Sequence, residues 1–327
     1  MDNYPISSHQ LGHFFGVDGK QLQQQYKDHI SDFHCWDQKE HASDWMLFEK
    51  NCGASLSIDE TALSNGELYT IVTNKAAKGR KGTIVAMIKG TQAEYIMAVL
   101  NRLPARVRNN VREVTMDMAA NMVLAIRRSF PKAERVIDRF HVQKLAYDAV
   151  QEVRIKYRWE ALDQENAAIQ AAKEKKEAFH PEVFSNGDTL KQLLARSRYL
   201  LFKHQSKWTA SQKERADILF PRYPFLLRAY QLSIRLGNIF TVCKSKEQAF
   251  KRLAIWYNDV ESSGIDSFRT VSRSVQSHYL SILNFFNNRS TNASAESFNA
   301  KVKAFRATSR GVRDTEFFLF RLAKIYA

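Results

Sequence analysis

The sequence predicts an α/β protein in which helices cover a mixed β-sheet. Three strand-like runs, at residues 55–59, 68–73 and 83–88, follow one another with glycine-containing turns between them. Strand patterns then alternate with amphipathic helical patterns, so the predicted order is β-β-β-α-β-α-β-α. Three successive strands favour an antiparallel meander, and strands separated by helices favour parallel pairing.

The alternating part can be assigned element by element. A helix over 91–103 ends before Pro104, and a strand over 111–117 follows it. The next helix keeps its apolar residues on one face and ends before Pro131. A short strand over 135–138 then leads into a long helix. Residues 36–50, before the first strand, have the character of a linker.

The chain divides into four predicted parts. Residues 1–50 form a helical N-terminal segment, whose two short helices around a glycine turn fit a partial helix-turn-helix and an ordinary helical hairpin equally well. Residues 51–157 hold the first part of the sheet core. Residues 158–287 are helical throughout and are predicted to be an insertion, and residues 288–327 return to the core as the helix that carries the third acid.

The chain carries a large excess of basic residues. Its 49 lysines and arginines exceed its 34 aspartates and glutamates, which gives a formal charge of +15. An excess of this size predicts a polyanionic partner such as DNA, and the alternative is an ordinary soluble basic protein. The candidate DNA contacts are Lys78, Arg80, Lys81, Arg127, Arg128, Arg139, Asn299, Lys301, Lys303, Arg306, Arg310 and Arg313.

Cysteine usage and the N-terminal sequence predict a cytoplasmic protein. The 3 cysteines lie far apart, with no C-x-x-C pair for a zinc or redox motif, which indicates a reducing compartment. The first residues lack the basic-then-apolar build of a signal peptide, and no run approaches the ~18 apolar residues of a membrane span. We expect a cytoplasmic, nucleoid-associated protein with no membrane partner.

Three acidic residues are candidates for one metal site. Asp59 and Asp117 end predicted strands, and Glu296 lies in a basic helix near the C-terminus. Two Mg²⁺ ions about 3.5–4 Å apart can activate a nucleophile and neutralise the leaving oxygen at a phosphodiester, and Mg²⁺ prefers carboxylate ligands. We predict these three acids to be catalytic ligands of Mg²⁺, with Mn²⁺ as a substitute. Taken singly, a strand-end aspartate is more often a turn or cap residue and a helical glutamate is usually solvated. Glu60 and Asp138 are weaker competitors.

Four motifs carry a resemblance to a known family. Residues 56–61 (LSIDET), 114–118 (VTMDM) and 292–303 (NASAESFNAKVK) are similar to its three acidic motifs, and residues 138–141 (DRFH) are similar to its Asp-Arg-Phe-His element. The chain resembles the DDE transposases of bacterial insertion sequences, specifically the ISL-type family and its two-reading-frame Bacteroidetes relatives. The likeness runs from about residue 7 to the C-terminus. It implies a ribonuclease H-like fold with a large helical insertion before the last acid.

The resemblance also implies an activity. Such an enzyme uses Mg²⁺ to nick DNA at the element's ends and joins the freed strand-end hydroxyl to target DNA, with Asp59, Asp117 and Glu296 as metal ligands. Asp138 and His141 are candidate accessory residues, and a packed histidine at a helix start explains His141 equally well. The implied partners are double-stranded DNA and further copies of the chain in a dimer or larger assembly. Because this chain has no cysteine cluster for the N-terminal zinc module of many relatives, a separate DNA-binding protein is a further expected partner.

Two other functions remain open at this point. One is a ribonuclease H-like nuclease without strand transfer, which would release cut DNA and give no joined products. The other is a non-catalytic DNA-binding regulator or inactive remnant, which would bind DNA in a salt-sensitive way without any metal-dependent product.

Overall fold

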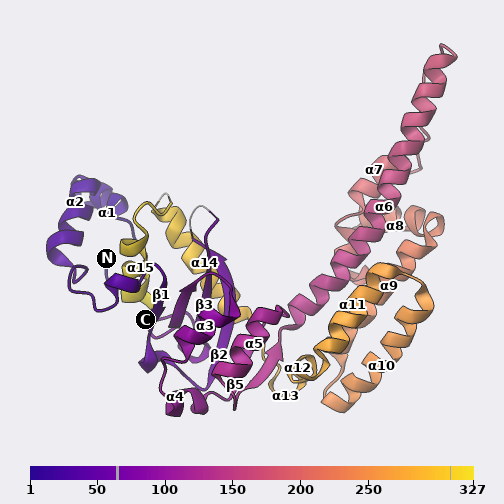
Figure 1. The fold of residues 1–327 in the computed structure, drawn as a ribbon. Helices are drawn as coiled ribbons and strands as arrows, with labels where there is room; N and C mark the ends of the chain where they lie inside the picture. Colours follow the sequence, from indigo (N-terminus) through magenta and orange to yellow (C-terminus); the bar gives the residue numbers. More distant parts are fainter. Residues whose placement is uncertain (64–65, 310) are drawn as a thin grey trace. The chain divides into compact units, whose positions relative to one another are not determined.

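The computed structural model of the chain describes residues 1–63, 66–309 and 311–327. It divides into two compact units. The first comprises Met1–Asp138 and Asn288–Ala327, and the second comprises Arg139–Asn287. Figure 1 follows the chain through both units. None of the described helices combines the length and the apolar character needed to cross a membrane.

A six-stranded mixed sheet with the order β1-β4-β3-β2-β5-β6 forms the centre of the first unit. The first four strands in this order pair antiparallel, whereas β5 and β6 continue the sheet parallel to β2. This confirms the predicted α/β class, with a meander followed by parallel strands. The strand bounds are β1 Trp45–Leu47, β2 Ser55–Ala62, β3 Leu68–Asn74, β4 Ile84–Lys89, β5 Glu113–Met116 and β6 Glu134–Ile137.

The edge strand β1 corrects the prediction of a linker over residues 36–50. Trp45 pairs with Ile88 and Leu47 pairs with Ala86 in an antiparallel ladder with β4. A strand of three residues is too short for apolar and polar residues to alternate visibly, so its sequence carries no strand signal. Its partner β4 is buried on both faces, as expected of an inner strand.

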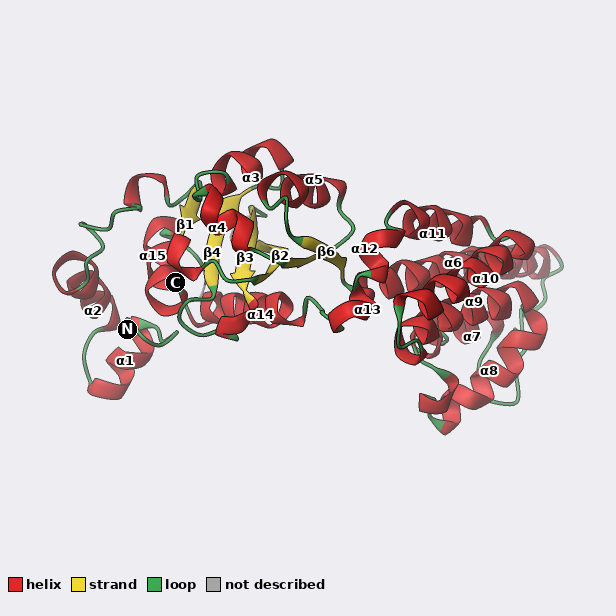
Figure 2. Cartoon of the chain, turned by 90° about the horizontal axis from the view of Figure 1, so that it is seen from below, coloured by secondary structure: helices red, strands yellow, loops and turns green. Residues whose placement is uncertain are grey.

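Helices cover both faces of the sheet. α3 (Ala93–Leu100) and α5 (Ala120–Ser129) lie over one face, and α14 (Ala293–Thr308) lies under the other, as Figure 2 shows. The predicted helix over 91–103 is shorter than expected, and α4 (Ala105–Asn110) follows it after Pro104. The core between the sheet and the last two helices contains Tyr69, Ile71, Met87, Phe298, Val302, Phe305, Leu319 and Leu322.

The N-terminal helices α1 (Ser8–Phe15) and α2 (Gly19–Gln25) form a hairpin. Gly16 ends α1 at φ +67°, a left-handed conformation that glycine adopts without strain. A single π-helical turn (Tyr26–Ile30) follows α2, and its Tyr26 packs with Phe33 against Phe317 and Phe320 of α15 (Thr315–Tyr326). This aromatic cluster fixes the N-terminal segment to the C-terminal helix.

The second unit consists of helices joined by loops, with one isolated β-bridge between Val183 and Thr189. It begins at Arg139 with α6, which runs without a break for 36 residues. The predicted start of the insertion at residue 158 stays a prediction. Trp256 is buried in this unit and donates its indole N–H to the carbonyl of Leu232 at 2.9 Å. The helix bounds are α6 Arg139–Glu174, α7 Leu190–Arg196, α8 Ala210–Arg222, α9 Pro224–Val242, α10 Lys246–Ser263, α11 Asp266–Ser277, α12 Tyr279–Leu283 and α13 Phe285–Asn288.

Candidate metal centre

Two aspartates directly follow neighbouring parallel strands, and a third lies within β2, which continues to Ala62 and so does not end at Asp59 as predicted. β5 and β6 are paired up to their last residues, and β5 is also paired with β2. Asp117 and Asp138 directly follow the last residues of β5 and β6, and Asp59 lies on β2 two residues beyond its last pairing with β5. The carboxyl ends of adjacent parallel strands meet at one edge of a sheet. The topology therefore places Asp59 and Asp117 at the same edge, together with Asp138.

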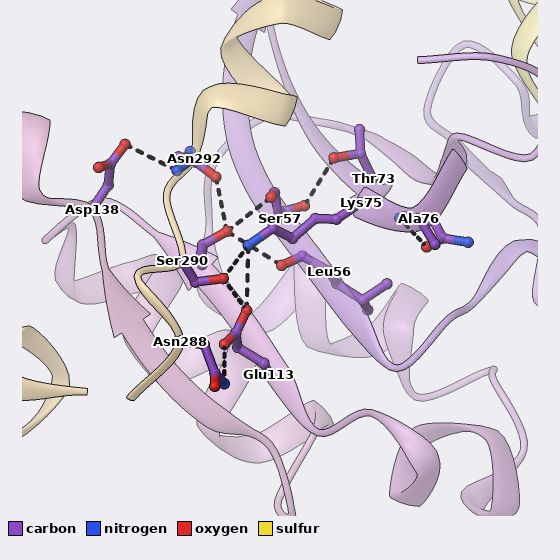
Figure 3. A network of polar contacts seen from close by, with 12 residues as sticks. Leu56, Ser57, Thr73, Lys75, Ala76, Glu113, Asp138, Asn288, Ser290 and Asn292 are labelled. Carbon is purple, nitrogen blue, oxygen red and sulfur yellow. Dashed lines mark hydrogen bonds and ion pairs between the residues drawn. The ribbon is translucent and has the colours of Figure 1, made fainter. Parts of the chain in front are cut away.

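Asn292 connects this edge to the start of α14 (Figure 3). Its backbone N–H donates to Asp138 Oδ2 at 3.1 Å, and its side-chain amide donates to the carbonyl of Ile58 at 3.3 Å. Its Oδ1 accepts a hydrogen bond from the hydroxyl of Thr115 at 3.3 Å. The residue is completely buried. These contacts fix the beginning of α14 against β2, β5 and β6.

Glu296 follows Asn292 by one helical turn. Its backbone N–H donates to the carbonyl of Asn292 at 3.0 Å, and its side chain is exposed. One carboxylate oxygen of Glu296 lies within 4.8 Å of one carboxylate oxygen of Asp138. Two acids this close attract a divalent cation, because its charge offsets their mutual repulsion.

The three predicted ligands Asp59, Asp117 and Glu296 do not form a group as tight as Asp138 and Glu296 do. Among the described residues, Asp59 and Asp117 do not join Glu296 in a group whose ligand atoms all lie within 4.8 Å of one another. A centre with two ions about 3.5–4 Å apart distributes its ligands over both ions, so it does not require one such tight group. Asp117 also has a local structural contact, because its Oδ1 accepts the backbone N–H of Ala119 at 2.9 Å at the start of α5.

Asn299, two turns into α14, contacts Asp59 directly. Its side-chain amide donates to Asp59 Oδ2 at 2.8 Å and to the carbonyl of Glu60 at 3.3 Å. The other oxygen of Asp59 accepts the backbone N–H of Glu60 at 2.9 Å. Asn299 is only 6% exposed, and its own Oδ1 is buried without a hydrogen-bond partner in the part of the chain that the structure describes.

Negative charge accumulates at this edge of the sheet. Glu60 is half-buried, and burial together with the charges of Asp117 and Asp59 raises the pKa of its carboxyl above the ordinary 4.5. A raised carboxyl pKa means that the ionised form is disfavoured here. A bound cation would remove this penalty, so the electrostatics of the edge favour a positively charged ligand.

A second polar network holds the segment that leads into α14. Glu113, buried at the start of β5, accepts hydrogen bonds from the hydroxyl of Ser290 and, at 3.3 Å, from the amide of Asn288. Lys75 donates to Ser290 Oγ at 2.7 Å and forms an ion pair with Glu113 at 3.3 Å. Burial opposes ionisation, but the hydrogen bonds from Ser290 and Asn288 and the charge of Lys75 lower the pKa of Glu113. Figure 3 shows that these residues and Asn292 hold the same stretch of chain.

Most predicted DNA contacts are on the surface. Lys301 is partly buried and donates to the carbonyl of Gly79 at 2.8 Å, so it also holds the turn before β4. Arg306 is partly exposed, Asn299 is buried, and Arg310 lies outside the described residues. The exposed candidates are Lys78, Arg80, Lys81, Arg127, Arg128, Arg139, Lys303 and Arg313.

Not all of these surface residues lie near the acids. Arg127 and Arg128 are in the last turn of α5, which starts at the carboxyl end of β5 and returns to the beginning of β6. They therefore lie toward the opposite end of the strands from Asp138. His141 and Arg139 belong to the first turn of α6 in the second unit, where His141 follows Asp138 by three residues in the sequence.

Sequence reasoning missed Asn292 and Glu113 as supports of the site. Asn292 did offer a signal, because asparagine directly before a helix is a preferred cap residue. Its side chain does not cap the helix and reaches the strands instead. Glu113 offered none, since a single acid inside a strand pattern does not reveal partners far along the chain.

Comparison with known sequences identifies the family. The sequence model of the ISL3-type DDE transposases, described as a transposase family, matches residues 56–322 and so covers most of the chain, including all three acidic motifs. The chain belongs to this transposase family. The mixed sheet with its helical insertion is accordingly a ribonuclease H-like core. The finer likeness to two-reading-frame Bacteroidetes relatives stays a prediction.

One curated protein that is similar to this chain is the transposase for insertion sequence element IS1001 from Bordetella parapertussis. The two are 25% identical over 283 residues, which make up 85% of this chain and 61% of the relative. The chain therefore spans less than two thirds of that relative's length.

Proposed function

We propose that the chain is an insertion-sequence transposase that cleaves DNA at element ends and joins the freed strand to target DNA. The main support is the row of Asp59, Asp117 and Asp138 at one edge of the sheet, with Glu296 beside Asp138. This donor set consists of carboxylate oxygens, which suits Mg²⁺ or Mn²⁺ and not a metal that selects thiolates.

Asp59, Asp117 and Glu296 would hold Mg²⁺, with Asp138 as an accessory acid. The residues fit such ions, because this part of the sheet disfavours ionisation of Glu60 and the side-chain oxygen of Asn299 has no hydrogen-bond partner among the residues that the structure describes. When bound, the ions activate the attacking oxygen and neutralise the leaving oxygen. The protein's own part is to hold the acids on strands and on a helix that is hydrogen-bonded to those strands through Asn292 and Asn299.

Two displacements at phosphorus complete the reaction. In cleavage, a water oxygen bonds to phosphorus and the bond from phosphorus to the 3′ oxygen at the element's end breaks. The water loses a proton and the 3′ oxygen gains one. In joining, this 3′ hydroxyl bonds to a target phosphorus, loses its proton, and displaces a target 3′ oxygen, which takes up a proton.

DNA binding completes the proposal. The exposed cations near α14, among them Lys303 and Arg313, are suited to bind phosphates, and His141 is a candidate contact to the DNA backbone. We expect the protein to act in the cytoplasm on the nucleoid, as a dimer or larger assembly on paired ends. A separate DNA-binding protein would help to recognise those ends. Light scattering of the chain with and without end DNA measures the assembly.

The test is cleavage and joining of element-end DNA in Mg²⁺. Asp59→Asn, Asp117→Asn and Glu296→Gln should each abolish both products while leaving folding and DNA binding unchanged. Glu94→Gln, an exposed acid on α3, is the matched control and should keep full activity. Retained cleavage in one of the three variants would remove that residue from the site. Cleavage without joined products would support a nuclease, and salt-sensitive binding without any product would support a regulator.

A further inference from the structure

Two buried amides and the third acid lie along one side of α14 and of Asn292, the residue directly before it. Asn292, Glu296 and Asn299 are spaced by four and three residues, which places them on one side of a helix. Both asparagines are buried, whereas Glu296 between them is exposed. Asparagine is seldom buried without a specific polar partner. The side-chain partners of these two amides are on β2 and β5: Ile58 and Thr115 for Asn292, and Asp59 and Glu60 for Asn299.

Both oxygens of Asp59 accept hydrogen bonds. Asn299 donates to Oδ2 from α14, and the backbone N–H of Glu60 donates to Oδ1. Hydrogen bonds to both oxygens of a carboxylate fix its orientation, and such partners of a metal ligand set the direction in which it faces a cation. The bond from Asn299 is the only one of the two that a side-chain substitution can remove.

The side-chain oxygen of Asn299 lacks the hydrogen bond that a buried amide oxygen normally accepts. Its Oδ1 is completely buried and accepts no hydrogen bond from the described residues. A buried carbonyl oxygen without a donor costs stability, and an apolar side chain of similar size at this position would avoid that cost. An asparagine at residue 299 therefore costs folding stability, and packing alone does not explain its presence there. Its amide group contacts Asp59, a candidate metal ligand.

We propose that Asn299 is a positioning residue that orients the Asp59 carboxylate toward a divalent cation. Asn292 supports it by fixing the first turn of α14 to the strand ends. This inference rests on the proposed function and deepens it. It also gives Asn299 a role different from the DNA contact suggested by its sequence position, because a side chain that is 6% exposed has little surface to offer a phosphate.

The test uses the full chain with Asn299→Ala and Asn299→Leu. The leucine nearly preserves the side-chain volume, so it separates loss of the donor from loss of packing. Asn110→Ala, at an exposed asparagine at the end of α4, is the control. Binding of Mn²⁺ in the absence of DNA is followed by the electron paramagnetic resonance of the free ion. Both Asn299 variants should bind Mn²⁺ about 10- to 100-fold more weakly, the usual effect of removing a partner of a metal ligand.

A second readout separates positioning from a general loss of structure. In Asn299→Leu, cleavage of end DNA should require more Mg²⁺ for half-maximal rate while the rate at saturating Mg²⁺ recovers toward that of the parent. In an Asp59→Asn background, adding Asn299→Leu should change Mn²⁺ binding no further, since the two residues act through one carboxylate. Additive effects, or unchanged Mn²⁺ binding in a folded Asn299→Leu protein, would overturn the inference.

The outcomes also distinguish this inference from the proposed function. If Asp59→Asn alone binds Mn²⁺ as well as the parent, the proposed metal centre is wrong. If Asp59→Asn loses Mn²⁺ while both Asn299 variants keep it, the metal centre stands and only the role of Asn299 is wrong.

Discussion

The backbone N–H of Asn292 donates a hydrogen bond to Asp138 over 3.1 Å, and this bond joins the start of α14 to the end of β6. The side chain of Asn292 adds bonds to β2 and β5. Glu296 is one turn further along the same helix, so its position follows from where Asn292 is held. An acid that is remote in sequence is thereby placed beside Asp138.

Replacing Asn292 with alanine should destabilise the first unit. The substitution leaves the carbonyl of Ile58 without this donor and Thr115 without one of its partners, and an unsatisfied buried polar group costs about 1–3 kcal/mol. Denaturant unfolding should show a loss of that size, whereas Asn110→Ala at an exposed site should stay within about 0.5 kcal/mol of the parent. Equal stability of the two variants would contradict the role of Asn292.

Glu113 should make stability depend on pH in the acidic range. Its pKa is lowered in the fold, so its contribution is fully present above the ordinary value of 4.5 and is lost as the pH falls through the lower folded value. Glu113→Gln should therefore cost about 1–3 kcal/mol at neutral pH, and the difference from the parent should shrink on acidification. Unfolding curves at neutral pH and at about pH 3 measure this. A difference that is constant with pH would show that the charge of Glu113 does not matter.

The sequence predicted the sheet because its signals are local. The alternating and apolar strand runs and the Pro104 and Pro131 stops marked most elements of the first unit. The positions of Asp117 and Asp138 directly after strands followed from the same patterns. The predicted end of the first strand at Asp59 was wrong, because β2 continues to Ala62 through residues that lack an apolar run. The edge strand β1 was missed because three residues carry too little pattern.

The supports of the site could not be predicted in the same way. Glu113 is bonded to Asn288 and Ser290, which are remote from it in the chain, and no local pattern encodes such partners. The sequence places Asn299 on a predicted helix beside Lys303 and Arg306, and this neighbourhood led to the prediction of a DNA contact. Its contact with Asp59 depends on the rotation of α14, which is set by packing of Phe298 and Val302 against the sheet.

Two lysines on α14 should behave differently in DNA binding. Lys303 is exposed, so Lys303→Ala should weaken binding to any DNA sequence and reduce the slope of log affinity against log salt by about 1. Lys301→Ala should in addition lower the melting temperature, because Lys301 holds the carbonyl of Gly79. Fluorescence anisotropy across a salt series and thermal melts measure both effects. Lys132→Ala, at an exposed lysine before β6, is the control. If Lys132→Ala changed the slope equally, the effect would come from the net charge of the protein and not from a contact between Lys303 and DNA.

Glu60 and Asp59 are neighbours on β2, and the response of stability to Mn²⁺ should separate their roles. Without metal, the raised pKa of Glu60 means that its ionised form destabilises the fold above that pKa. Glu60→Gln should therefore be more stable than the parent at neutral pH, by less than about 1 kcal/mol because solvent screens a half-exposed charge. This advantage should disappear as the pH falls through the raised pKa, since Glu60 of the parent then becomes neutral.

Adding Mn²⁺ then decides which neighbour is a ligand. At 100 times the dissociation constant a cation that binds only the folded protein stabilises it by about 2.7 kcal/mol. The parent and Glu60→Gln should both gain this stabilisation, and Asp59→Asn should gain almost none. Thermal melts in chelator and in Mn²⁺ measure the gain for each protein, with Glu94→Gln as the exposed control. If Glu60→Gln loses the gain and Asp59→Asn keeps it, Glu60 is the β2 ligand and Asn299 orients a carboxylate that takes no part in metal binding.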